Sequence, residues 1–546
     1  MKRIIKILQK KNISSLIILL IFIFLNFIVK KTCQQETEND PPKYEIHLFF
    51  GKMGLNTLYC DDNIEIYGTA NINYYKIDEN NNKININSYI TKNSAEGFCL
   101  YPIKYNVISI NEKIIIEIIG KPKKLKQLFA DSHIKKIERF DYPFPIDETD
   151  MNGLFYHCIE LEYVDLSNFI FTNTKDVSKM FYSCPKLTQI IFPINSQSNN
   201  IEDFSDMFSF STELKIVDLS SFSFQKAKNM GYMFNGCSKL EEIIFPKNEV
   251  AQNVELFSDM FSTCTKLKSL DLSGFSFKNV RNMAYMFNGC YSLVSIKFPT
   301  NEKTTNLQHI KYMFAGCSNL TSIDISGLSF VNIVDINSLF NECSSLKTLI
   351  LPQNEIASNI QDFSRMFYGC WNLTEIDLSN IDFANAKKLS YMFYQCKSLE
   401  NIEFYTSVKA TKVTNCQSMF LYCENLKKID LSNFSFNLAR DLSAMFFYCS
   451  SLETVILPKD ELATNIEDIS YMFAICFKLK IIDLSGISFT KIKDMSYLFS
   501  NCISLETIIF PDDIETGNNI ENIAFIFANC HQLTSIDLSK FNLFNI

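Results

Sequence analysis

Residues 264–290 read CTKLKSLDLSGFSFKNVRNMAYMFNGC, and the same plan returns along most of the chain. Residues 267–272 form L-x-x-L-x-L, and the end of this pattern alternates apolar and polar positions as a short, half-buried strand does. Residues 280–287 then place apolar side chains at helical spacing, which predicts about two turns of helix. A unit of strand, loop and short helix is typical of leucine-rich repeats.

The repeat is easiest to follow at its last motif, Met/Leu/Ile-Phe-x-x-Cys, whose copies lie 26 or 27 residues apart with a final spacing of 28. The last residues of these copies are Cys158, Cys184, Ser211, Cys237, Cys264, Cys290, Cys317, Cys343, Cys370, Cys396, Cys423, Cys449, Cys476, Cys502 and Cys530. Units with Asp-Leu-Ser (once Asp-Ile-Ser) alternate with units most of which carry Phe-Pro or Leu-Pro, so the full period is 53 residues. Such a period predicts a solenoid of about sixteen coils over residues 128–546, rather than several globular domains.

These tandem units, of the form MSYMFxxCxxLxxIDLSxFxF, resemble the BspA-like leucine-rich-repeat surface proteins. The resemblance covers more than three quarters of the chain. It implies an α/β solenoid, a leucine-rich-repeat horseshoe with a parallel β-sheet on the concave face and short helices on the convex face. It also implies a secreted or surface-displayed protein that binds a protein ligand of a host, a matrix or a neighbouring cell. It brings no catalytic residues.

The N-terminus looks like a targeting segment. Basic residues precede an apolar run at 13–29, and two lysines follow it. Within residues 1–33 this pattern predicts either a cleaved signal peptide or a retained single-pass anchor, and no small-residue cleavage site decides between them. Both alternatives place the remaining chain outside the cytoplasm, secreted or at the cell surface, and the apolar segment is its only expected contact with the membrane.

Residues 34–127 lie outside the repeat. They contain short, partly alternating runs rich in Ile and Tyr, which predict strands of a β-rich N-terminal domain or cap. Cys60 and Cys99 are a candidate disulfide pair in an oxidising compartment, and two buried thiols are the alternative.

The cysteines of the repeat raise a separate question of chemistry. A metal site needs clustered ligands and a catalytic thiol needs a neighbouring base, whereas these cysteines recur singly. We therefore expect buried structural thiols, with disulfides between neighbouring coils as the alternative. The candidate core cysteines are Cys184, Cys237, Cys264, Cys290, Cys317 and Cys370.

A candidate interaction surface lies on the exposed side of the expected strands. Alternate coils carry an aspartate there, and most of the intervening coils carry an isoleucine. The aspartates are Asp165, Asp218, Asp271, Asp324, Asp377, Asp430, Asp483 and Asp537, and the isoleucines are Ile191, Ile244, Ile350, Ile456 and Ile509. Exposed apolar rows favour a protein-docking surface, and the alternative is a solvated sheet face that the aspartates keep soluble.

Other classes of function find little support in the sequence. The net charge of −8 is spread without a basic block, which argues against nucleic-acid binding. The sequence has no phosphate-binding loop, nucleophile elbow or zinc-protease motif, so we expect no enzyme activity, cofactor or metal. The chain stops within a unit, so we expect either that the natural chain continues or that this edge pairs with another molecule. The second alternative suggests, as an alternative function, a structural protein that self-associates through this edge.

Overall fold

The computed structural model describes six short stretches before the solenoid, at 43–50, 54–58, 71–77, 83–85, 103–107 and 113–119, and then residues 127–541. Within that last range it omits 128, 141–149, 197, 248–250, 300–302, 354, 460–461, 512–519, 537 and 539–540. The apolar run at 13–29 and the candidate pair Cys60 and Cys99 lie outside the described residues. Among the residues that are described, no helix combines the length and apolar character needed to cross a membrane.

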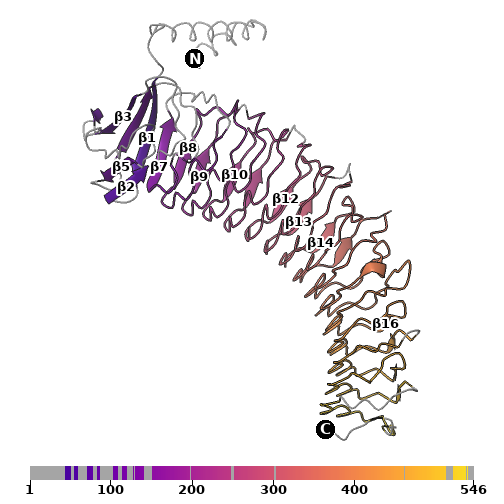
Figure 1. The fold of residues 1–546 in the computed structure, drawn as a ribbon. Coiled ribbons are helices and arrows are strands. Elements are labelled where there is room, and N and C mark those ends of the chain that lie inside the picture. Colours follow the sequence, from indigo (N-terminus) through magenta and orange to yellow (C-terminus); the bar gives the residue numbers. More distant parts are fainter. Residues whose placement is uncertain are drawn as a thin grey trace, which may run out of the picture.

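The described repeats form one curved solenoid of about 14 turns, shown in Figure 1. This is fewer than the sixteen predicted, and the first expected unit is occupied by a longer strand, β7 (Ile134–Phe140), which also belongs to the N-terminal sheet. The other solenoid strands have three residues each: β8 (Tyr163–Asp165), β9 (Gln189–Ile191), β10 (Ile216–Asp218), β11 (Glu242–Ile244), β12 (Ser269–Asp271), β13 (Ser295–Lys297), β14 (Ser322–Asp324), β15 (Thr348–Ile350), β16 (Lys428–Asp430), β17 (Thr454–Ile456), β18 (Ile481–Asp483) and β19 (Thr507–Ile509).

The strands before the solenoid join its sheet. They are β1 (Lys43–Phe50), β2 (Gly54–Leu58), β3 (Asn71–Ile77), β4 (Lys83–Asn85), β5 (Ile103–Val107) and β6 (Lys113–Ile119). One sheet has the order β4-β3-β6-β1-β7-β8-β9, antiparallel as far as β7 and parallel from β7 onward, while β2 and β5 form an antiparallel pair. The antiparallel strands therefore cover the first strand edge of the solenoid.

Beyond β9 the solenoid strands pair in twos. β10 pairs with β11, β12 with β13, β14 with β15, β16 with β17 and β18 with β19, all parallel. Each pair joins an Asp-Leu-Ser or Asp-Ile-Ser coil to the coil that follows it. The hydrogen-bonded ladder thus follows the 53-residue double repeat.

The apolar stripe that predicted a helix forms turns instead, so the prediction of short convex helices is wrong. The structure describes no α-helix in the solenoid, and its one short 3-10 helix is η2 (Phe383–Asn385). Across 283–290, alternate N–H groups bond within the coil, as from Cys290 to the Phe287 carbonyl (3.1 Å). The others bond the next coil, as from Gly289 to the Ala315 carbonyl (2.7 Å).

The backbone dihedral angles explain why no helix forms. Tyr285 (φ 59°) and Gly289 (φ 72°) are left-handed, and most other coils also have two left-handed residues four positions apart. An α-helix needs right-handed angles at every residue, so each left-handed residue ends it. The apolar side chains Met283, Met286 and Phe287 are nevertheless buried in the core, because the successive turns also point them inward.

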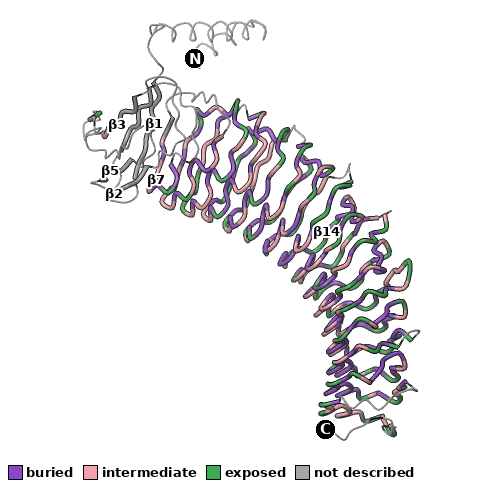
Figure 2. Tube along the Cα trace, in the orientation of Figure 1, coloured by how far each residue is buried: buried purple, intermediate pink, exposed green. Residues whose placement is uncertain are grey.

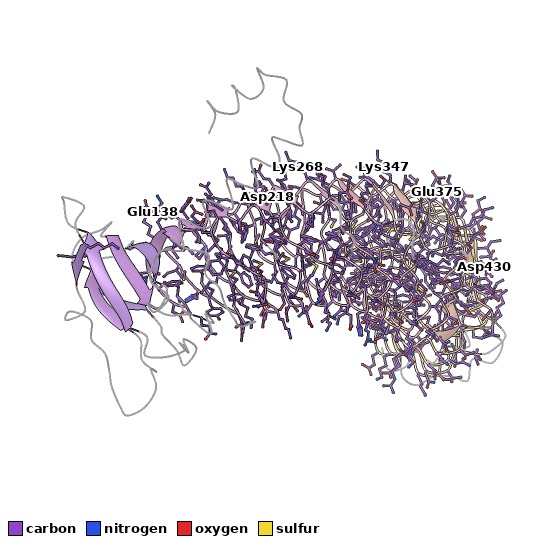
Figure 3. All side chains as sticks on the ribbon, turned by 90° about the horizontal axis from the view of Figure 1, so that it is seen from above. Glu138, Asp218, Lys268, Lys347, Glu375 and Asp430 are labelled. Atoms are coloured by element: carbon purple, nitrogen blue, oxygen red, sulfur yellow. The ribbon has the colours of Figure 1, made fainter. Side chains whose placement is uncertain are left out.

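The strands do not line the inside of the arc. In Figure 1, β8 to β14 cross a flank between the inner and outer edges, and β16 lies toward the outer side. Figure 3 shows the same from above, with Asp218, Lys268, Glu375 and Asp430 along one margin of the solenoid. The concave position predicted for the sheet is therefore wrong, because the coils curve about a different side. We call the exposed side of β8 to β19 the strand face.

Stacked phenylalanines form the centre of the solenoid. The Phe three residues before each repeat cysteine is buried, except the partly buried Phe527, and its ring packs nearly parallel to those of adjacent coils. The ring centroids of Phe314 and Phe340 are 5.4 Å apart, and those of Phe340 and Phe367 are 5.7 Å apart. Figure 2 shows how buried and exposed residues alternate around each coil, so one narrow core runs the length of the solenoid.

Candidate functional site

The predicted aspartate row lies on the strand face. In β14 the middle residue, Ile323, is buried, and Ser322 and Asp324 on either side of it are exposed. Most other solenoid strands show the same inward-facing middle residue. The alternation expected from the sequence therefore places the aspartates outward, with the exception of Asp537, which lies outside the described residues.

Each described aspartate also accepts a hydrogen bond from the backbone that follows it, although the coil of Asp377 has no described strand. The Ser326 N–H donates to Asp324 Oδ1 (2.9 Å), and six further coils repeat the contact from the second residue after the aspartate. Hydrogen bonds from Ser379 lower the pKa of Asp377, so this carboxylate stays charged at neutral pH. One oxygen of each carboxylate, Oδ1, is thus used within its own coil.

The isoleucine row lies directly beside the aspartates. Asp324 pairs with Ile350 in the strand register, and the same pairing joins Asp430 with Ile456 and Asp483 with Ile509. The isoleucines of these three pairs are exposed to 44%, 42% and 42%, whereas Ile191 and Ile244 are half-buried. The strand face therefore alternates acidic and apolar side chains from coil to coil.

Two ion pairs interrupt this alternation. Lys297 takes an isoleucine position and its Nζ lies 3.1 Å from Asp271 Oδ2, and Lys459 Nζ lies 2.6 Å from Asp483 Oδ2. In the coil after Asp377 a glutamate, Glu403, replaces the isoleucine. The face is consequently most acidic in its central coils.

The repeat cysteines form a column of thiols inside the solenoid. The structure places each of them in the core without a disulfide, and only Cys530 is partly exposed. The Cys290 thiol donates to the Phe261 carbonyl of the preceding coil (3.0 Å), and Ser211 makes the same bond with its hydroxyl (2.7 Å). The bond recurs in the coils of Cys158, Cys184, Cys237, Cys264, Cys317, Cys343, Cys370, Cys396, Cys423, Cys449, Cys476, Cys502 and Cys530. Each thiol is therefore a hydrogen-bond donor between coils as well as a small core side chain.

The surroundings of these thiols are unreactive. Burial raises the pKa of Cys237 and of Cys290 to about 12, so almost no thiolate forms at neutral pH. In the part of the chain that the structure describes, no three His, Cys, Asp or Glu side chains are placed to hold a metal ion.

Thiol labelling checks this arrangement. We expect a thiol reagent such as a maleimide at pH 7.5 to leave Cys237 and Cys290 unmodified in the folded chain and to modify both in denaturant, because folding removes access and thiolate together. Peptide mass spectrometry after a short pulse gives the extent of modification at each cysteine. Rapid labelling of Cys290 in the folded chain would contradict the buried column.

A second polar ladder, which we did not predict, lies where each coil enters its turn. Its members, paired from coil to coil, include Asp150, Asp176, Asp203, Asn229, Asn282, Asp335, Asp362, Asn415, Asp441, Asp468, Asp494 and Asn522. The side-chain oxygen of each accepts the N–H of the second residue after it, as from Ser178 to Asp176 (2.8 Å). The signal was the Asp or Asn found eight residues before many repeat cysteines.

We expect Asp176→Asn to stabilise the chain at neutral pH. Burial raises the pKa of Asp176, hydrogen bonds from Ser178 oppose this, and Asp203 and Asp150 raise it further. Because folding raises the pKa of Asp176, the charged carboxylate destabilises the folded chain. This cost is fully present above the folded-state pKa and is absent below the usual pKa of 3.8. The gain should therefore shrink as pH falls toward 4, as urea unfolding at pH 7 and pH 4 would show. The reverse change Asn229→Asp is the control and should destabilise at pH 7.

Partly or fully exposed aromatic residues form a further row that we did not predict. On the turns, the ring centroids of Tyr285 and Tyr312 are 4.8 Å apart, those of Tyr471 and Tyr497 4.6 Å, and those of Tyr497 and Phe525 4.9 Å. The signal was the tyrosine that often precedes Met-Phe in the repeat. These rings stack on one another between adjacent coils. They have no charged or catalytic group beside them that recurs in every described coil.

The solved structures that are similar to this chain include two repeat proteins of bacteria. A leucine-rich repeat protein from Eubacterium ventriosum is 14% identical, with 71% of this chain and 81% of that chain covered and a TM-score of 0.24. The functional domain of InlJ from Listeria monocytogenes, whose description mentions a cysteine ladder, is 13% identical, with 70% and 72% covered and a TM-score of 0.16. These TM-scores are too low to support an argument about the fold, which rests on the coils themselves. No curated protein matches this chain.

A protein-family profile matches almost the whole solenoid. The profile is described as "Mycoplasma protein of unknown function, DUF285", and its overlapping matches cover residues 127–216, 149–270, 202–323, 308–429, 361–480 and 467–546. None of these comparisons names a BspA-like protein, so that narrower resemblance stays a prediction. Because the matches span well over half of the sequence, the chain belongs to the DUF285 repeat family.

Proposed function

We propose that this protein is an interaction scaffold that binds another protein through its strand face. The observation that carries the proposal is the alternation of exposed aspartates and isoleucines in adjacent, hydrogen-bonded strands. Apolar side chains exposed in a row favour burial against a partner, and the charges beside them give selectivity. A repeated scaffold with variable outward residues is a common basis for protein recognition.

The partner we propose is a protein of a host, a matrix or a neighbouring cell, met at the cell surface or after secretion. This part of the proposal rests on the basic and apolar N-terminal residues 1–33 and on the resemblance of the repeats to surface proteins. Labelling of intact cells with a membrane-impermeant reagent, followed by sequencing of the mature N-terminus, tests it. Labelling only after lysis would contradict surface display.

Charge reversal tests the binding face. We expect the full chain carrying Asp271→Lys, Asp324→Lys and Asp377→Lys to lose most of its adhesion to cells or to immobilised fibronectin, collagen or laminin, because three charges on the strand face change sign. The control carries Glu213→Lys, Glu255→Lys and Glu467→Lys, which reverse charges on other faces. Plate adhesion is the measurement, with circular dichroism to confirm folding. Equal loss in both variants, or loss in neither, would contradict the strand face as the binding site.

A further inference from the structure

The central strand face carries several exposed carboxylates, and an exposed lysine, Lys428, lies two residues before Asp430 in the same strand. Among the described residues, no ion pair involves Asp324, Asp377, Glu403 or Asp430, and all four are exposed. They lie on successive coils with Ile350 between the first two. Elsewhere on the solenoid, basic and acidic side chains of adjacent coils do pair: Lys228 with Glu202, Arg281 with Glu255 and Lys493 with Glu467.

The spacing of these residues is set by the coils. The stacked phenylalanines of the coils that carry Asp324 to Ile456 are separated by 5.4, 5.7, 5.3, 5.6 and 5.3 Å. Along this column two coils therefore advance by about 11 Å and five coils by about 27 Å. The hydrogen-bonded strands of the strand face lie slightly closer, at about 4.8 Å for each coil. Aspartates recur every two coils. Ile350 lies halfway between Asp324 and Asp377, Glu403 lies between Asp377 and Asp430, and Ile456 follows Asp430.

An α-helix matches this spacing and an extended chain does not. Seven helical residues advance about 10.5 Å, and three or four residues advance about 5 Å. Side chains on one face of an extended strand recur about every 6.6–6.8 Å. This distance matches neither the spacing of one coil nor the spacing of two coils. A helix lying along the coil direction can thus present one basic residue to each aspartate and one apolar residue to each intervening isoleucine.

We propose that the strand face between Asp324 and Ile456 binds a basic amphipathic helix, in which lysine or arginine recurs every seven residues with an apolar residue halfway between. This rests on the proposed function and names the chemistry of the partner. Opposite charge steers such a helix to the face, and the isoleucines bury its apolar positions. About 18 residues of helix would span the five coils.

The test uses the full chain and two synthetic fluorescent peptides of the same composition. One peptide places Lys every seven residues with Leu halfway between, and the other alternates Lys and Leu at a period of two. Fluorescence anisotropy gives the affinity, and circular dichroism gives the helix content of the bound peptide. We expect the seven-residue peptide to bind at least tenfold tighter, to gain helix on binding, and to weaken as salt rises.

The structure supplies a matched variant for this test. Asp324→Asn, Asp377→Asn and Asp430→Asn together remove three charges and keep the hydrogen bond from the following backbone, since Asn229 and Asn282 make the equivalent bond with their amide oxygens. We expect this variant to bind the seven-residue peptide roughly tenfold more weakly, because each exposed charge contributes only modestly. The control Glu213→Gln, Glu255→Gln and Glu467→Gln removes the same charge elsewhere and should bind as the unchanged chain does.

The outcomes separate the two proposals. If the period-two peptide binds as well or better, and the asparagine variant weakens it, the strand face binds an extended basic chain and the helix proposal is overturned. If neither peptide responds to the asparagine variant, both the helix and the strand-face binding site are overturned. Tight binding by the seven-residue peptide, lost only in the asparagine variant, supports both.

Discussion

Phe340→Ala is expected to lower the free energy of unfolding by about 3–5 kcal/mol. The Phe340 side chain is fully buried, and its ring packs between those of Phe314 and Phe367, at 5.4 and 5.7 Å. Truncation removes apolar contact on both sides and leaves a cavity that the hydrogen-bonded coils cannot close. Because each coil contacts mainly its neighbours, the loss should divide the solenoid into two less coupled halves.

Urea unfolding followed by circular dichroism measures this loss. The control is Phe525→Ala, since Phe525 is 62% exposed and its removal should cost less than about 1 kcal/mol. Phe340→Leu should fall between the two, because it keeps part of the buried volume. Similar midpoints for Phe340→Ala and Phe525→Ala would show that the phenylalanine column does not stabilise the solenoid as described.

Gly486→Ala is expected to cost about 2–4 kcal/mol, a large effect for one methyl group. A Cβ at Gly486 would collide with the carbonyl oxygen of Pro458 in the preceding coil. That obstacle is backbone and cannot rotate away, so the two coils would have to separate. Separation would strain the neighbouring bond from the Ala463 N–H to the Gly486 carbonyl (2.9 Å).

Gly327→Ala is the matched control for this effect. Gly327 occupies the same place in its coil, and there a Cβ would lie 3.4 Å from the Pro299 carbonyl oxygen, an ordinary contact. This change should be neutral or slightly stabilising, because alanine restricts the unfolded chain more than glycine does. Thermal unfolding of both variants gives the comparison, and equal melting temperatures would contradict the close approach at Gly486.

The sequence predicted well those features that follow from periodicity. The spacing of the repeat cysteines gave parallel coils, and the L-x-x-L-x-L alternation gave strands with Asp324 outward and Ile323 inward. Its helix prediction failed at residues 283–290, because Met283, Met286 and Phe287 are compatible with a helix and with successive turns that both face the core. Gly289 was the available clue, since glycine is favoured at left-handed positions.

By itself, the sequence determined that the chain is a repeat array with alternating acidic and apolar positions along its strands, because side-chain period and repeat length are local properties. Only the tertiary structure decided which side of each coil lies on the inside of the arc. The curvature of the arc depends on how far apart adjacent coils are on each of their sides. Only the tertiary structure, likewise, showed that the Cys290 thiol donates to the carbonyl of Phe261. Those two residues are 29 positions apart, and no pattern within one unit specifies their contact.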